Sequence, residues 1–171
     1  MSLQEKVIIA LKRMIELLNN DYYEFYKRRF KWSGYISSNQ MHLDVQFELC
    51  ESLKMCFPNE GWDFELSQGA GKNDKYDYFN KLGEKFELKC ASQKGKDKCV
   101  EWRNGQTNLD KNFEFDCLFI YDGIEETKYK INGSWFGKTS FNKWSIDKVK
   151  DVTNRYAIRR KGVSNHCEQI M

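Results

Sequence analysis

Two carboxylates and one amine lie close together in the segment Tyr76–Cys90, at a spacing that suits metal-assisted chemistry. Asp77 precedes Glu87 by ten residues, and Lys89 follows Glu87 by two. Side chains two apart in a β-strand share one face, about 7 Å apart, so Glu87 and Lys89 would lie side by side. Carboxylate oxygens suit a hard divalent cation, and a neighbouring ammonium stabilises developing negative charge. We therefore interpret these residues as a hard-cation site with a cationic partner.

A β-hairpin would hold these groups together. Apolar side chains alternate with the charged pair and would point to a core: Phe86, Leu88 and Cys90. The stretch Leu82-Gly83-Glu84 is typical of a tight turn. A chain reversal there would bring Asp77 back beside Glu87. The alternative interpretation is an exposed strand face that carries only a cross-strand ion pair.

Two further carboxylates are candidates for the metal site. Asp74 stands three residues before Asp77 and is an alternative first ligand. We favour Asp77 because the shorter hairpin reaches Glu87 more directly. Glu48 belongs to an acidic face of a predicted helix and could add a ligand or hold a water. A solvated helix face would explain Glu48 equally well.

Helices are expected before the hairpin. A 3.6-residue apolar period over residues 2–30 predicts one long helix or two joined helices, with Ser2 and Glu5 at capping-box spacing. A second helix is expected over residues 40–57, closed by Pro58.

Strands are expected on both sides of the hairpin. Residues 62–66 alternate like a strand, and the apolar run 115–121 predicts a buried central strand. Asn132-Gly133 predicts a hairpin turn within residues 126–136, and residues 145–152 suggest a short helix.

Composition favours one soluble domain of 171 residues. We divide it into a helical N-terminal arm (1–35), a catalytic core (36–125) and a C-terminal hairpin with a basic tail (126–171). Charged residues make up 31% of the chain, and no apolar run reaches the length of a membrane span, so no membrane partner is expected. The chain opens on a charged amphipathic segment and not on a signal pattern, which favours a cytoplasmic location. Its six cysteines lack paired-ligand spacing, so we expect reduced cysteines and no structural zinc.

Basic and amide side chains cluster in segments that could contact DNA. The net charge of +3 is only mildly basic, so these segments matter more than the total. Such side chains bind phosphates and base edges, although they are also ordinary loop residues. The candidate DNA contacts are Arg28, Arg29, Lys94, Lys96, Arg103, Asn104, Gln106 and Asn108.

Asp77, followed after nine residues by Glu87-Leu88-Lys89, forms a motif that resembles that of the PD-(D/E)xK nuclease superfamily. The small type II restriction endonucleases of this superfamily are the most similar in pattern. Tyr76 stands where the name motif has proline. The resemblance extends over residues 40–122 as an order of elements. It implies an α/β (α+β) fold with a restriction-endonuclease-like core, in which helices flank a mixed central sheet and a long helix leads the chain.

The resemblance also implies an activity. Mg²⁺, or Mn²⁺ in its place, would be held by Asp77 and Glu87, while Lys89 would orient the attacking water. The expected enzyme is a homodimer that cuts double-stranded DNA at a specific sequence and leaves 5′-phosphate ends. A structure-specific or repair nuclease of the same fold is a second hypothesis. A nucleic-acid-binding protein without catalysis is a third.

Overall fold

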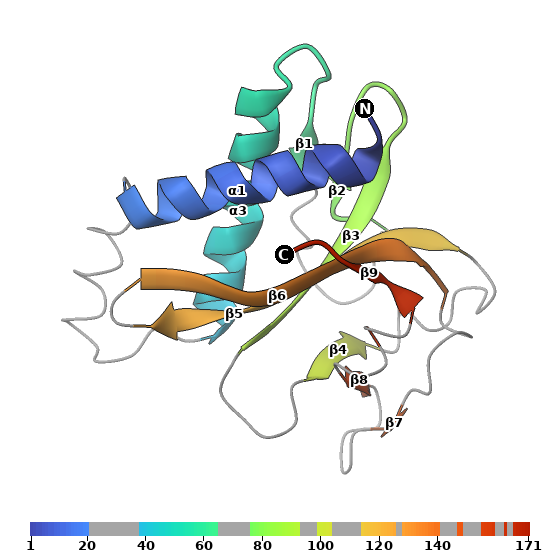
Figure 1. Ribbon diagram of the computed structural model, residues 1–171. Helices are drawn as coiled ribbons and strands as arrows, with labels where there is room; N and C mark the ends of the chain where they lie inside the picture. The colour runs from blue at the N-terminus through green and yellow to red at the C-terminus, as the bar shows by residue number, and fades with distance from the viewer. Residues whose placement is uncertain are drawn as a thin grey trace.

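The computed structural model describes part of the chain, and every structural statement below concerns that part. The described residues are 1–20, 38–64, 76–92, 99–103, 114–125, 128–140, 147–148, 155–159, 163 and 166–171. Together they form a mixed α+β fold with two helices packed on a six-stranded mixed sheet (Figure 1). The expected α+β class and the long N-terminal helix are therefore confirmed.

Helix α1 (Leu3–Asn20) begins at the predicted capping box. The Glu5 backbone N–H donates to Ser2 Oγ at 3.3 Å, and Ser2 N donates to Glu5 Oε2 at 2.6 Å. This reciprocal pairing satisfies two donors at the helix start. An apolar stripe that includes Leu11 and Met14 is buried. The predicted continuation to residue 30 lies outside the described residues.

Helix α3 (Ser38–Cys56) confirms the helix expected over residues 40–57. Proline cannot donate a helical hydrogen bond, and α3 ends two residues before Pro58. Val45, Leu49 and Leu53 repeat at helical spacing and are fully buried. Their side chains join the cluster that α1 forms with the sheet, so both helices cover the same sheet face.

The central sheet has the strand order β1-β2-β3-β5-β6-β9. Strands β3 and β5 run parallel, and the other neighbours run antiparallel. The strands are β1 (Asp63–Phe64), β2 (Tyr78–Phe79), β3 (Lys85–Ser92), β5 (Phe115–Glu125), β6 (Lys128–Thr139) and β9 (Glu168–Gln169). A second sheet, seen below the first in Figure 1, joins β4 (Cys99–Arg103), β8 (Arg155–Arg159) and β7 (Asp147–Lys148).

Apolar side chains are buried on both faces of the central sheet. Phe86, Leu88 and Leu118 pack with the helices on one face. Cys117 and Phe119 belong to a second cluster, on the opposite face. Alternation along β3 and β5 produces this division, because neighbouring residues point to opposite sides. The predicted buried strand at 115–121 is confirmed as the first part of β5.

Two predicted local elements are wrong. Asn132-Gly133 lies inside the continuous strand β6 and makes no hairpin turn. Tyr121 pairs with Gly133 and Asp122 with Ile131, so Asn132 is the extra residue of a bulge. Strand pairing with β5 outweighs the local turn preference. The helix expected over 145–152 is also contradicted, because Asp147–Lys148 forms strand β7.

No described helix is long and apolar enough to cross a membrane.

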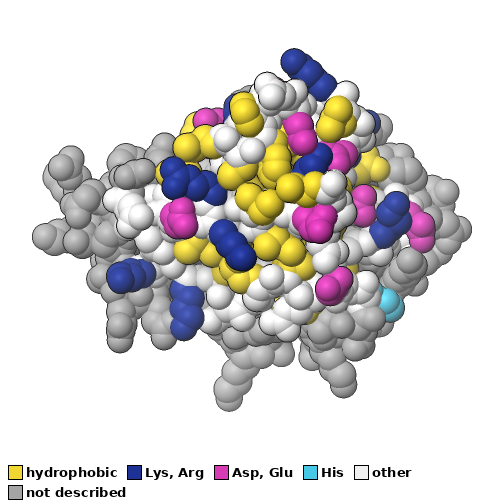
Figure 2. Space-filling view, turned by 45° about the horizontal axis from the view of Figure 1, so that its top comes forward, with side chains coloured by type: hydrophobic (Ala, Val, Ile, Leu, Met, Phe, Trp, Pro, Cys, Tyr) yellow, Lys and Arg dark blue, Asp and Glu magenta, His cyan; other side chains and the backbone are white. Residues whose placement is uncertain are grey.

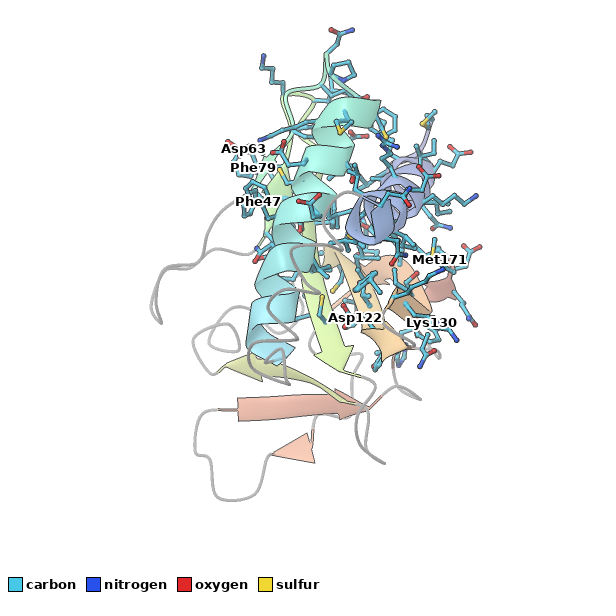
Figure 3. The ribbon with its side chains drawn as sticks, turned by 90° about the vertical axis from the view of Figure 1, so that its left-hand side faces the viewer. Phe47, Asp63, Phe79, Asp122, Lys130 and Met171 are labelled. Carbon is cyan, nitrogen blue, oxygen red and sulfur yellow. The ribbon has the colours of Figure 1, made fainter. Side chains whose placement is uncertain are left out.

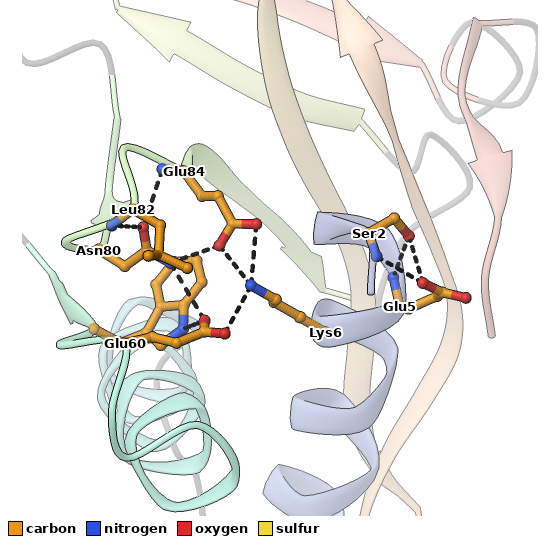
Figure 4. Close-up of polar contacts among 8 residues, drawn as sticks. Ser2, Glu5, Lys6, Glu60, Asn80, Leu82 and Glu84 are labelled. Atoms are coloured by element: carbon orange, nitrogen blue, oxygen red, sulfur yellow. Dashed lines mark hydrogen bonds and ion pairs between the residues drawn. The ribbon is translucent and has the colours of Figure 1, made fainter.

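A buried lysine ties α1 to the β2–β3 hairpin. Lys6 Nζ lies 2.8 Å from Glu60 Oε1 and 2.9 Å from Glu84 Oε2 (Figure 4). Asn80 Nδ2 donates to Glu84 Oε2 at 2.6 Å, which extends the network into the hairpin turn. Burial alone would lower the pKa of Lys6, but Glu60 and Glu84 outweigh it and raise that pKa. Lys6 therefore remains charged and links the helix to the hairpin.

We expect Lys6→Met to lower the free energy of unfolding by about 2–3 kcal/mol, because two partly buried carboxylates would lose their shared cation. Chemical denaturation at neutral pH measures this change. Lys12→Met, on the exposed side of α1, is the control and should change stability by less than about 0.5 kcal/mol. Equal effects of the two substitutions would contradict a structural role for Lys6.

A second buried polar contact joins β5 to β6. Asp122 is fully buried, and Tyr129 Oη donates to its Oδ2 at 2.8 Å. Asn19 at the end of α1 exchanges hydrogen bonds of 3.0 and 3.2 Å with the Tyr129 backbone. Burial raises the pKa of Asp122 to about 7, and the Tyr129 hydrogen bond only partly opposes it.

A raised folded-state pKa makes Asp122 stabilising at low pH, with a contribution that is lost as pH rises toward 7. Between pH 5 and pH 8 we expect this residue alone to remove about 2–3 kcal/mol of stability. Asp122→Asn keeps an acceptor for Tyr129 and should flatten that pH dependence. Denaturation curves of both proteins at the two pH values test this, and parallel pH profiles would contradict it.

Candidate active site

The hairpin of β2 and β3 brings Asp77 beside Glu87. Tyr78 pairs with Phe86, so the next residues outward, Asp77 and Glu87, face each other across the ladder. Asp77 N donates to the Phe86 carbonyl at 3.2 Å. Leu88 N donates to Asp77 Oδ2 at 2.8 Å, which fixes the carboxylate against β3. The hairpin predicted from the sequence is therefore present.

The turn of this hairpin is built by Asn80 and Gly83. The Asn80 side-chain oxygen accepts hydrogen bonds of 3.0 Å from Leu82 N and Glu84 N. Gly83 has φ of +82°, a conformation that favours glycine. These local bonds set the register that places Asp77 opposite Glu87.

The three predicted catalytic residues share the sheet face that turns away from α1 and α3. Tyr78 and Phe86 stack at 4.6 Å on the helix side, so alternation turns Asp77, Glu87 and Lys89 to the other side. Lys89 Nζ lies 2.5 Å from Glu87 Oε1. Their side chains are only 15% and 4% exposed, so this is a largely buried ion pair.

Burial and neighbouring charges act in opposite directions on the pKa values of Asp77 and Lys89. Burial raises the pKa of Asp77, although Lys89 and the Leu88 N–H oppose the rise. Burial by itself would lower the pKa of Lys89, but Glu87 and Asp77 outweigh it and raise the pKa. At neutral pH Lys89 is therefore an ammonium. The site therefore holds one ammonium beside two carboxyl groups, of which Asp77 has the raised pKa.

Strand β5 supplies a wall of this site that sequence reasoning missed. Cys117 is the parallel partner of Glu87, and Phe119 is the partner of Lys89. Both are fully buried in the cluster on the same face. Burial raises the pKa of Cys117 well above its usual value, and Glu87 adds to the rise. The apolar run 115–121 predicted a core strand, but nothing in that run indicated that it would pair with the strand that carries Glu87.

Glu48, a lower-ranked metal candidate, does not join Asp77 and Glu87 in a metal-binding group. Glu48 is 2% exposed and lies on α3, in the layer that packs on the other sheet face. Among the described side chains, no three Asp, Glu, His or Cys residues form a metal-binding group. Asp74 lies outside the described residues.

Of the predicted DNA contacts, the structure places only Arg103, within β4. It stands directly opposite Arg155 of β8 in the antiparallel ladder. The other candidates fall outside the described residues: Arg28, Arg29, Lys94, Lys96, Asn104, Gln106 and Asn108.

Comparisons with protein-family models, curated proteins and solved structures found no match to this chain.

We expect Asp77→Asn to increase stability at pH 8 by about 1 kcal/mol, because the amide avoids burying a charged carboxylate and still offers Leu88 N an acceptor. The gain should shrink as pH falls through the range in which Asp77 is protonated. Thermal unfolding of the two proteins at pH 8 and pH 5 measures it. A clear loss of stability at pH 8 would show that Asp77 serves the fold and not a site.

Proposed function

We propose that this chain is a magnesium-dependent endonuclease that hydrolyses phosphodiester bonds in double-stranded DNA. The observation that carries the proposal is the placement of Asp77, Glu87 and Lys89 on one sheet face, with Lys89 Nζ 2.5 Å from Glu87. Burying three charges together is costly for a fold that needs only stability. Perturbed charges of this kind are characteristic of functional sites.

The donor chemistry fits a hard divalent cation. Asp77 and Glu87 offer carboxylate oxygens from adjacent strands, and a cation would offset the burial that raises the pKa of Asp77. Mg²⁺ is the proposed ion, with Mn²⁺ able to replace it. When bound, such an ion acidifies a water and neutralises charge on the phosphate.

Lys89 acts in this proposal as a fixed positive charge. Its raised pKa rules out a neutral amine as the principal form at neutral pH, so general-base catalysis is disfavoured. The ammonium orients the attacking water and stabilises the negative charge that builds on the scissile phosphate. Its ion pair with Glu87 holds it in place before substrate arrives.

The proposed class is a restriction-type endonuclease, active as a homodimer at a two-fold-symmetric sequence and leaving 5′-phosphate ends. The antiparallel β2–β3 hairpin, followed by the parallel strand β5, supports a core of the restriction-endonuclease kind.

Incubation of plasmid DNA with the protein and Mg²⁺ tests the proposal. Discrete fragments are expected from a sequence-specific enzyme, whereas nicking or cleavage only at junctions would favour a structure-specific nuclease. DNA binding without cleavage in any divalent metal would contradict both and leave a binding protein.

Near-isosteric variants test the three residues. We expect Asp77→Asn, Glu87→Gln and Lys89→Gln each to reduce the cleavage rate by at least about 100-fold, because each removes a charge that acts on the metal or the phosphate. Lys12→Gln is the matched control, since it removes an exposed lysine on the helical side. Circular dichroism and thermal unfolding establish that the variants are folded. Full activity in any of the three would exclude that residue from catalysis.

A further inference from the structure

The sheet face that carries Asp77 and Glu87 continues toward the hairpin turn with an aromatic ring and a second cation. Phe79 pairs with Lys85, two residues along each strand from the Asp77 and Glu87 pair. The intervening pair, Tyr78 and Phe86, points to the helical side. Side chains two apart are separated by about 7 Å, so Phe79 and Lys85 border the candidate active site.

Both of these side chains are available to a ligand. Phe79 is 39% exposed although it is large and apolar. Lys85 is exposed, and its Nζ lies 5.6 Å from the centre of the Tyr76 ring. Tyr76 immediately precedes Asp77 and packs against the cluster of Cys117 and Phe119. The contact with Tyr76 therefore holds the Lys85 ammonium near the candidate active site.

We propose that Phe79 and Lys85 form a substrate-positioning strip, in which the Phe79 ring stacks on a base next to the scissile phosphate and Lys85 binds a flanking phosphate. This inference rests on the proposed nuclease function. DNA that reaches Asp77 and Glu87 must approach from the face on which the strip lies. Aromatic rings stack on bases of any sequence, and ammonium groups bind phosphates by charge.

The surroundings of the strip define the path of the DNA. Asp63 of β1 is the partner of Phe79 on the side away from Lys85, and Figure 3 shows Asp63 and Phe79 at the same edge of the molecule. The exposed Asp63 carboxylate would repel a phosphate there, so the DNA backbone passes on the Lys85 side. Among the described side chains on the side of the molecule seen in Figure 2, cationic and anionic groups are interspersed around an apolar area.

Stacking on Phe79 requires a base that has left the duplex stack. The strip therefore predicts a substrate nucleotide that is extruded or unpaired next to the cleaved bond. A mismatch at that position should speed cleavage relative to the matched duplex, because the cost of unstacking is already met. Phe79→Ala should abolish this advantage.

Binding of a fluorescent DNA fragment, in Ca²⁺ to prevent cleavage, tests the strip directly. We expect Phe79→Ala to weaken binding roughly 5- to 100-fold and Phe79→Tyr to restore it. With 2-aminopurine beside the cleaved bond, the wild-type protein should change the probe's fluorescence by stacking, and Phe79→Ala should not. Lys85→Ala should reduce the salt dependence of binding by about one phosphate contact, and Lys85→Arg should preserve it.

Controls come from the helical side of the protein. Ile9 is 38% exposed on α1, close to the exposure of Phe79, and Lys12 is an exposed lysine of the same helix. Ile9→Ala and Lys12→Ala should leave DNA affinity unchanged. If the wild-type protein cleaves DNA while Phe79→Ala and Lys85→Ala bind like wild type, the strip is overturned and the nuclease remains. If the wild-type protein neither binds nor cleaves DNA, both proposals fail. Binding without cleavage, weakened by both variants, overturns the nuclease and with it the placement of the strip beside a scissile phosphate.

Discussion

The ion pair between Lys89 and Glu87 is the interaction on which the candidate site depends. Both side chains are largely buried, and Asp77 lies on the same face beside them. A buried charge without a partner would be strongly destabilising, so Lys89 and Glu87 each require the other. The apolar side chains of Cys117 and Phe119 border this group and reduce its contact with water. In such surroundings the attraction between opposite charges is stronger than at the protein surface.

That arrangement holds only if β2 and β3 keep their register. A slip of one residue would turn Glu87 and Lys89 toward the helices and turn Phe86 and Leu88 toward the opposite face. The turn at Asn80 and Gly83 prevents the slip locally. Lys6 of α1 also opposes the slip, because its ammonium binds Glu84 in the hairpin turn and Glu60 in the segment that follows α3. The N-terminal helix thus contributes to the site without touching it.

The sequence was sufficient for features that depend on neighbours along the chain. Alternation predicted the faces of β3, the glycine turn predicted the hairpin, and Ser2 with Glu5 predicted the helix start. Features that depend on distant pairing were not predictable. Nothing near Lys6 indicates Glu60 or Glu84, and nothing near Glu87 indicates Cys117. The hairpin turn predicted at Asn132-Gly133 was wrong for the same reason, because pairing with β5 outweighs a local turn preference.

The two faces of the central sheet explain why a site of this kind can exist in so small a protein. On one face, α1 and α3 bury fully enclosed apolar side chains such as Leu49 and Phe86, which supply stability. The other face of β3 is thereby free to carry charges that oppose folding, such as the carboxylate of Asp77 with its raised pKa. A strand that is apolar on one side and ionic on the other can therefore support a fold and a chemical site at once.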